Sequence, residues 1–99
     1  MKYIVYILLC DQKIFYVGIT KSLEKRLKEH KSKLSFFTKK FSDIRLVYQE
    51  EYLDKKSAER REKQIKGWSS AKKKALITRN IEKLVRLSKA VSLLKPSSG

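Results

Sequence analysis

Residues 3–20 read YIVYILLCDQKIFYVGIT, which is two β-rich runs separated by a short polar break. The first run, Tyr3–Cys10, is apolar at both alternating positions, and this is typical of a strand buried on both faces. The break is Asp11-Gln12-Lys13, and the second run is Ile14–Thr20. The pattern predicts a β-hairpin at the start of the chain.

The length of the hairpin loop decides which side chains share a face of the sheet. A three-residue loop pairs Cys10 with Ile14. In that register Tyr6 lies opposite Gly18, and Tyr6 and Tyr16 become diagonal neighbours on one face, roughly 7–8 Å apart at the backbone. A two-residue loop would put the tyrosines on opposite faces. Gly18 would leave room beside Tyr6 for a ligand or a backbone to approach.

The rest of the chain carries helical patterns around one further strand. Ser22, Asp54 and either Ser69 or Ser70 are predicted helix N-caps, and Gly67 is a predicted helix stop. We expect helices from Ser22 to about Lys33, over 55–66, over 71–77 and over 80–94. We also expect a strand over 44–52, in which Ile44, Leu46 and Tyr48 alternate with Arg45, Val47 and Gln49. Residues 34–43 are expected to be irregular, and 95–99 to be a disordered tail after a single domain over 1–94.

The composition indicates a polyanionic partner. Lysine and arginine number 25 against 10 aspartates and glutamates, which gives a net charge of +15. Such a surface repels itself, and a bound polyanion relieves that cost. Nucleic acid is therefore the leading partner, and an anionic membrane surface is second.

Cysteine content and hydropathy predict where in the cell the protein is located. Cys10 is the only cysteine, so neither an intramolecular disulfide nor a cysteine-based zinc site is expected. This favours a reducing, cytoplasmic location. The apolar run Tyr3–Cys10 is far shorter than the ~20 residues that a membrane span needs, so no membrane span is expected, and no membrane is taken as a partner in preference to nucleic acid.

Three side chains in the helical segments carry chemistry. Arg26 and His30 lie four residues apart and therefore on one helix face. Arginine presents a forked donor to phosphate oxygens, and histidine moves protons near neutral pH. Glu62 shares a stripe with Ala58 and Ile65, where a carboxylate needs a partner or a metal ion.

Each of these residues also has a simpler interpretation. The two tyrosines fit ordinary strand aromatics, Arg26 and His30 fit solvated side chains, and Glu62 fits an i,i+4 pair with Lys66. Trp68 fits a core residue or a base-stacking platform. Phe36 and Phe37, near Lys39 and Lys40, fit either a DNA-facing loop or a loop anchor.

Taken in order, these residues resemble a known family. The chain is similar to GIY-YIG nuclease domains, and most closely to the small single-domain bacterial members related to the nuclease half of the excision-repair endonuclease. The resemblance covers roughly residues 2–80. The matching stretches are Val5–Leu8, Phe15–Thr20, Leu23–His30, Leu46–Tyr48 and Ala58–Ser69.

The resemblance implies an α+β fold, in which helices flank a three-stranded antiparallel sheet and an extra helix follows. It also implies single-metal hydrolysis of DNA with magnesium, or alternatively manganese. Tyr6 and Tyr16 match the motif tyrosines, and which of them is the base differs across the family. Arg26 matches the arginine that holds the scissile phosphate, His30 the helix histidine and Glu62 the metal ligand.

Three positions depart from the family pattern. Ile4 stands where the first motif often has glycine, Lys31 follows His30 where a glycine is usual, and Lys74 stands at the spacing of a family asparagine.

The expected function is metal-dependent cleavage of DNA, in repair or on branched or damaged DNA. The alternatives are a non-catalytic nucleic-acid-binding module with the same fold, and a basic scaffold for acidic surfaces. RNA is a second possible nucleic-acid partner, and the oligomeric state stays open. Basic and polar side chains are expected to contact nucleic acid at Thr20, Lys21, Lys39, Lys40, Lys66, Lys72 and Lys73.

Overall fold

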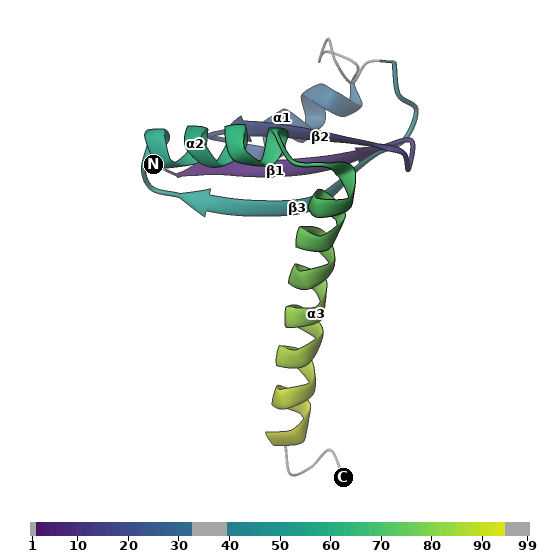
Figure 1. The fold of residues 1–99 in the computed structure, drawn as a ribbon, viewed down its shortest axis with the longest axis vertical. Helices are drawn as coiled ribbons and strands as arrows, with labels where there is room; N and C mark the ends of the chain where they lie inside the picture. Colours follow the sequence, from purple (N-terminus) through teal and green to yellow (C-terminus); the bar gives the residue numbers. More distant parts are fainter. Residues whose placement is uncertain (1, 33–39, 95–99) are drawn as a thin grey trace.

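The computed structural model describes the backbone over residues 2–32 and 40–94. Its elements in chain order are β1 (Tyr3–Cys10), β2 (Ile14–Thr20), α1 (Leu23–Lys31), β3 (Ile44–Tyr52), α2 (Lys55–Lys66) and α3 (Ser70–Leu94). The strands form one antiparallel sheet in the order β2-β1-β3, so the first strand is the central one (Figure 1). The expected α+β architecture is confirmed. The predicted irregular segment lies mostly, and the predicted tail entirely, outside the described residues.

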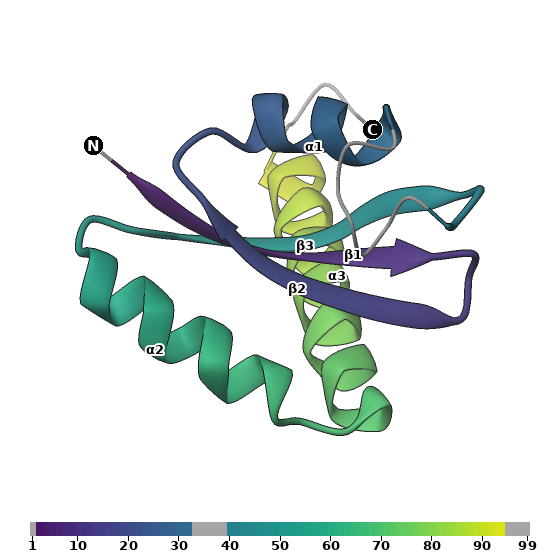
Figure 2. The same cartoon turned by 90° about the horizontal axis from the view of Figure 1, so that it is seen from above.

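The two faces of the sheet carry two separate cores. One core is formed by Tyr6, Leu8, Cys10, Phe41 and Ile44, against which Leu23 and Leu27 of α1 pack. The other core is formed by Val5, Ile7, Val17, Ala58, Ile65 and Ile77, and it joins the sheet to α2 and the start of α3. Figure 2 shows α1 and α2 on opposite sides of the sheet. Both alternations of β1 are buried because each faces one of these cores.

The hairpin has the register predicted for a three-residue loop. Cys10 pairs with Ile14, and Tyr6 pairs with Gly18. Asp11 and Gln12 adopt left-handed backbone with φ of 50° and 57°, a conformation that aspartate tolerates better than most residues. The Asp11 carboxylate also accepts hydrogen bonds from the backbone N–H groups of residues 42 and 43, at 2.9 and 2.8 Å. The loop is thereby held against the segment that leads into β3.

The predicted caps of α1 and α2 are confirmed. Ser22 Oγ accepts from the N–H of Lys25, and Asp54 accepts from Ser57. Helix α2 ends at Lys66, before Gly67, as expected, but α1 ends at Lys31 rather than about Lys33.

Two predictions about regular structure are wrong. The expected alternation along β3 fails because a bulge lies between the pairs Ile7–Tyr48 and Leu8–Leu46, so Val47 and Tyr48 pack against the same core. The two helices expected over 71–77 and 80–94 are one helix, α3, whose N–H of Lys72 is capped by Ser69. Asn80 interrupts the apolar pattern, but asparagine inside a helix costs no more than about 0.7 kcal/mol relative to alanine.

Among the described residues, no helix is long and apolar enough to cross a bilayer.

Candidate active site

A buried phenol–imidazole pair lies at the centre of the site. The hydroxyl of Tyr6, on the central strand, lies 3.0 Å from Nε2 of His30 on α1. Tyr6 is 1% exposed and His30 is fully buried. Because a buried imidazole needs a polar partner, this pair is the reason that His30 can enter the core. The simpler interpretation of His30 as a surface residue is wrong.

Tyr16 completes an aromatic cluster with this pair. Its ring centroid lies 6.2 Å from that of Tyr6 and 5.2 Å from that of His30, with the imidazole edge-on. Gly18 makes this packing possible, because a Cβ at that position would lie 2.5 Å from Cζ and Oη of Tyr6. The space expected to admit a ligand is therefore filled by the Tyr6 ring itself.

Arg26 lies one helical turn before His30 and acts on both members of the pair. Its positive charge lowers the pKa of Tyr6 and, after burial, is the main cause that lowers the pKa of His30. The guanidinium lies 3.7 Å from the carboxylate of Glu29. Its Nε is buried and has no hydrogen-bond partner. A buried donor of this kind is costly unless something binds it, and an anion would satisfy it.

Glu62 approaches the cluster from α2. Its side chain is 19% exposed and lies 3.5 Å from Nζ of Lys66, so the predicted helical pair exists. Its negative charge also raises the pKa of Tyr6, which places the carboxylate in the electrostatic neighbourhood of that phenol. Glu62 therefore forms the i,i+4 pair and also acts electrostatically on Tyr6.

The protonation states of the central pair follow from burial. Burial is the main cause that raises the pKa of Tyr6, and Tyr16 raises it further by charge and by a hydrogen bond. Burial is also the main cause that lowers the pKa of His30 below 6.5. The resting pair at neutral pH is thus a neutral phenol against a neutral imidazole, and not a phenolate.

The carboxylates at the site fit a metal ion that is shared with substrate. Within the described part of the chain, no group of three or more His, Cys, Asp or Glu side chains could hold a metal ion alone. Magnesium usually binds through one or two carboxylates, several waters and substrate phosphates. Glu62, as a single carboxylate that is 19% exposed, fits that manner of binding.

A cleft of about 450 Å³ adjoins the site between the first turns of α1 and α2. We call it the α1–α2 cleft. Its lining consists of Tyr3, Ile19, Thr20, Lys21, Ser22, Lys25, Arg26, Glu29, Lys55 and Glu59. Thr20 and Lys21, both predicted to contact nucleic acid, therefore share one surface with Arg26.

The other predicted contact residues that the structure describes are absent from the lining of this cleft. Lys66 pairs with Glu62, and Lys72 lies over the ring of Trp68, with its Nζ 4.3 Å from the ring centroid. Trp68 packs against the core that joins α2 and α3 to the sheet. Lys73 is half-buried on α3, and Lys40 lies beside Phe41 with its Nζ 5.4 Å from the ring centroid. Lys39, Phe36 and Phe37 are outside the described residues.

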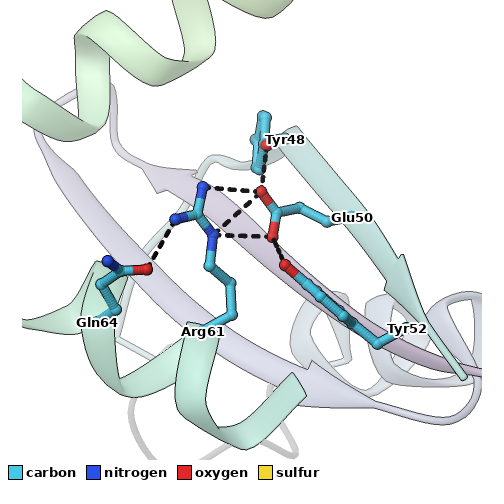
Figure 3. A network of polar contacts seen from close by, with 5 residues as sticks. All are labelled: Tyr48, Glu50, Tyr52, Arg61 and Gln64. Atoms are coloured by element: carbon cyan, nitrogen blue, oxygen red, sulfur yellow. Dashed lines mark hydrogen bonds and ion pairs between the residues drawn. The ribbon is translucent and has the colours of Figure 1, made fainter. Parts of the chain in front are cut away.

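One polar network was not expected from the sequence. Glu50 on β3 accepts from Nε and Nη2 of Arg61 on α2 at 2.9 and 3.0 Å, from the hydroxyl of Tyr52 at 2.6 Å, and from that of Tyr48 (Figure 3). Arg61 also donates to Gln64. The i, i+2 spacing of Tyr48, Glu50 and Tyr52 was the available signal, because alternate strand residues share a face.

Comparisons with known proteins found a matching family model, similar proteins and a similar solved structure. A family model described as the GIY-YIG catalytic domain matches residues 2–75. The UPF0213 protein of Syntrophus aciditrophicus is 40% identical over 82 residues, which cover 81% of this chain and 94% of that protein. The UPF0213 protein CPE1444 of Clostridium perfringens is 34% identical over 90 residues, which cover 90% of this chain and 97% of that protein. The solution NMR structure of the UPF0213 protein BH0048 from Bacillus halodurans matches with a TM-score of 0.53 and 34% identity, covering 79% of this chain and 84% of that one.

Proposed function

Since the chain belongs to the GIY-YIG family of nuclease domains, we propose that it is a metal-dependent endonuclease that hydrolyses DNA phosphodiester bonds. The family implies a nucleic-acid substrate, and the net charge of +15 supports binding to one. The observation that carries the proposal is the 3.0 Å contact between Tyr6 and His30, with Tyr16, Arg26 and Glu62 around it. Branched or damaged DNA is the substrate that we propose, with repair as the role.

The aromatic cluster supplies a route for the proton of the attacking water. Tyr16 is half-buried whereas Tyr6 and His30 are buried, so Tyr16 is the phenol that meets the water. Tyr16 takes a proton from the water and passes its own to Tyr6, whose hydroxyl proton moves to Nε2 of His30. The water oxygen bonds to phosphorus, the bond to the leaving sugar oxygen breaks, and His30 is left protonated. A neutral imidazole is the form that can accept this proton.

Arg26 and Glu62 act on the phosphate. Arg26, whose Nε has no hydrogen-bond partner in the structure, holds two phosphate oxygens and offsets the charge that grows on them. Glu62 would hold the magnesium or manganese ion together with waters and a phosphate oxygen. When bound there, the ion stabilises charge on the phosphate and on the leaving oxygen. Lys66, whose side chain is 53% exposed, is free to turn into solvent and release Glu62.

Replacement of single functional groups tests the proposal. We expect magnesium-dependent nicking of supercoiled plasmid by the wild-type protein. Tyr16→Phe should slow it by about 10²-fold or more, which is the contribution typical of a positioned acid–base group. Glu62→Gln should slow it strongly as well, because a neutral amide is a much weaker magnesium ligand than a carboxylate. The controls are Tyr52→Phe and Glu82→Gln, which remove the same groups outside the site and should nick at nearly the wild-type rate. Equal nicking by all five proteins would contradict the proposal.

A second candidate function is a non-catalytic nucleic-acid-binding module. The ion pair of Glu62 with Lys66 favours it, because that pair already satisfies the only carboxylate assigned to a metal. This alternative predicts salt-dependent DNA binding that Glu62→Gln leaves unchanged, with no cleavage in magnesium or manganese. The plasmid experiment and a binding titration on the same proteins separate the two functions.

A further inference from the structure

We propose that the α1–α2 cleft binds one unpaired nucleotide of the substrate strand, next to the phosphate that is cut. The inference rests on the proposed nuclease function and adds a substrate class to it, namely DNA with a single-stranded arm. The cleft lies beside the reactive cluster because Arg26 belongs to both. Its side chain lines the cleft, and its charge acts on Tyr6 and His30.

The cleft is positively charged for two reasons that reinforce each other. Helices α1 and α2 begin at the same end of the sheet (Figure 2), so the positive ends of both helix dipoles lie beside it. Lys25 is the third residue of α1, and Lys55 is the first residue of α2. A cation in the first helical turn is electrostatically unfavourable, and a bound phosphate removes that penalty. Asp54, which caps α2, is absent from the lining.

The remaining lining fits the other parts of a nucleotide. Tyr3 and Ile19 supply apolar surface for a base, and the ammonium of Lys21 lies 5.5 Å from the Tyr3 ring centroid. Glu29 and Glu59 supply carboxylate acceptors, which would weaken binding to a bare row of phosphates but suit the amino groups of a base. A base stacked in a duplex cannot present its faces or its pairing edge to such a lining, so an unpaired nucleotide is the ligand.

Binding without cleavage tests this inference separately from the nuclease proposal. Fluorescence anisotropy in EDTA would compare a splayed-arm DNA with a blunt duplex of the same length. The test variant is Lys25→Ala with Lys55→Ala. The control is Lys28→Ala with Lys56→Ala, which removes the same charge from the same two helices outside the cleft. Far-UV circular dichroism confirms that all the proteins are folded.

The test variant should lose affinity for the splayed DNA about tenfold more than the control does. Its salt slope for that DNA should decrease by about 1.4, at about 0.7 for each of two single-strand phosphates. Tyr3→Leu, which keeps an apolar side chain but removes the aromatic face, should weaken binding of the splayed DNA by about tenfold and leave duplex binding unchanged.

Two outcomes would overturn the inference. Equal losses in the test and control variants would mean that the cleft lysines contribute only general charge. Equal losses for splayed and duplex DNA in both the lysine variant and Tyr3→Leu would mean that the cleft does not select an unpaired nucleotide. Neither outcome depends on whether the protein cuts DNA, which the plasmid experiment decides.

Discussion

The absence of a side chain at position 18 determines where the Tyr6 phenol lies. A methyl group there would be 2.5 Å from Cζ and Oη of Tyr6, so the ring would have to leave its place beside His30. We expect Gly18→Ala to cost about 1–3 kcal/mol of unfolding free energy, as overpacking does, and to abolish any nicking activity. Gly67→Ala is the matched control, because its Cβ would meet nothing closer than 3.6 Å. Urea unfolding that ranks the two variants equally would contradict this explanation.

His30 makes the stability of the protein depend on pH. Its pKa is lowered in the folded state, first by burial and then by Arg26, whereas the unfolded chain takes up the proton near pH 6.5. A lowered pKa means that the stabilisation is complete above pH 6.5 and is lost as the pH falls, by up to about 1.4 kcal/mol per pH unit. Urea unfolding at pH 7.5 and 5.5 should show this loss in the wild-type protein, and a smaller loss in His30→Gln. The same pH dependence in both proteins would exclude His30 as its source.

At the scale of elements, the sequence predicted features that depend on neighbouring residues better than features that depend on tertiary packing. Ser22 and Asp54 cap helices because their side chains bond the backbone three residues ahead, which is readable from the sequence. The bulge at Val47 depends on packing within the sheet, which residue spacing alone does not reveal. The continuity of α3 through Asn80 depends on how little an asparagine inside a helix costs, and spacing does not reveal this either. In the candidate site, the hairpin pattern predicted the register that brings Tyr6 and Tyr16 together. It did not predict the burial of His30 or the filling of the space at Gly18.

The network around Glu50 joins α2 to the edge strand β3. Burial alone would raise the pKa of the Glu50 carboxyl, but Arg61, Tyr48 and Tyr52 together hold it below its ordinary value. Glu50 and Arg61 are only 16% and 23% exposed at their side chains. We therefore expect Glu50→Gln to cost about 2–3 kcal/mol at neutral pH, because it leaves a largely buried guanidinium without its charged partner.

The control for this prediction is the next residue along β3. Glu51 pairs with Lys2 at 3.0 Å, but both side chains are more than half exposed, so Glu51→Gln should cost less than about 1 kcal/mol. Because the pKa of Glu50 is lowered on folding, its contribution is present above the ordinary carboxyl pKa and is lost as the pH falls through the folded value. Urea titrations of both variants at pH 7 and pH 3 would check the size and the sign. If the two variants still differed in unfolding free energy at pH 3 by as much as at pH 7, the ionised Glu50 carboxylate could not be the source of the difference.

At the scale of the whole molecule, the structure consists of a compact body and a projecting helix (Figure 1). The sheet with α1 and α2 holds the buried tyrosines, the site and the α1–α2 cleft. Helix α3 begins against that body through Leu76 and Ile77 and then extends away from it (Figure 1), with Ile81 already 53% exposed. The proposed chemistry therefore belongs to the compact part, which the family model covers almost entirely.

The central position of β1 has a consequence for how the protein is made. Tyr3–Cys10, which is synthesised before the other two strands of its sheet, can pair with β2 after only a three-residue loop. Its other edge stays unpaired until Ile44–Tyr52 has been synthesised. During that interval an apolar strand edge is exposed to neighbouring nascent chains, and this is a condition under which strands aggregate. In the folded protein the Asp11 carboxylate accepts hydrogen bonds from the backbone N–H groups of residues 42 and 43, and it thereby holds the residues that lead into β3 beside that edge.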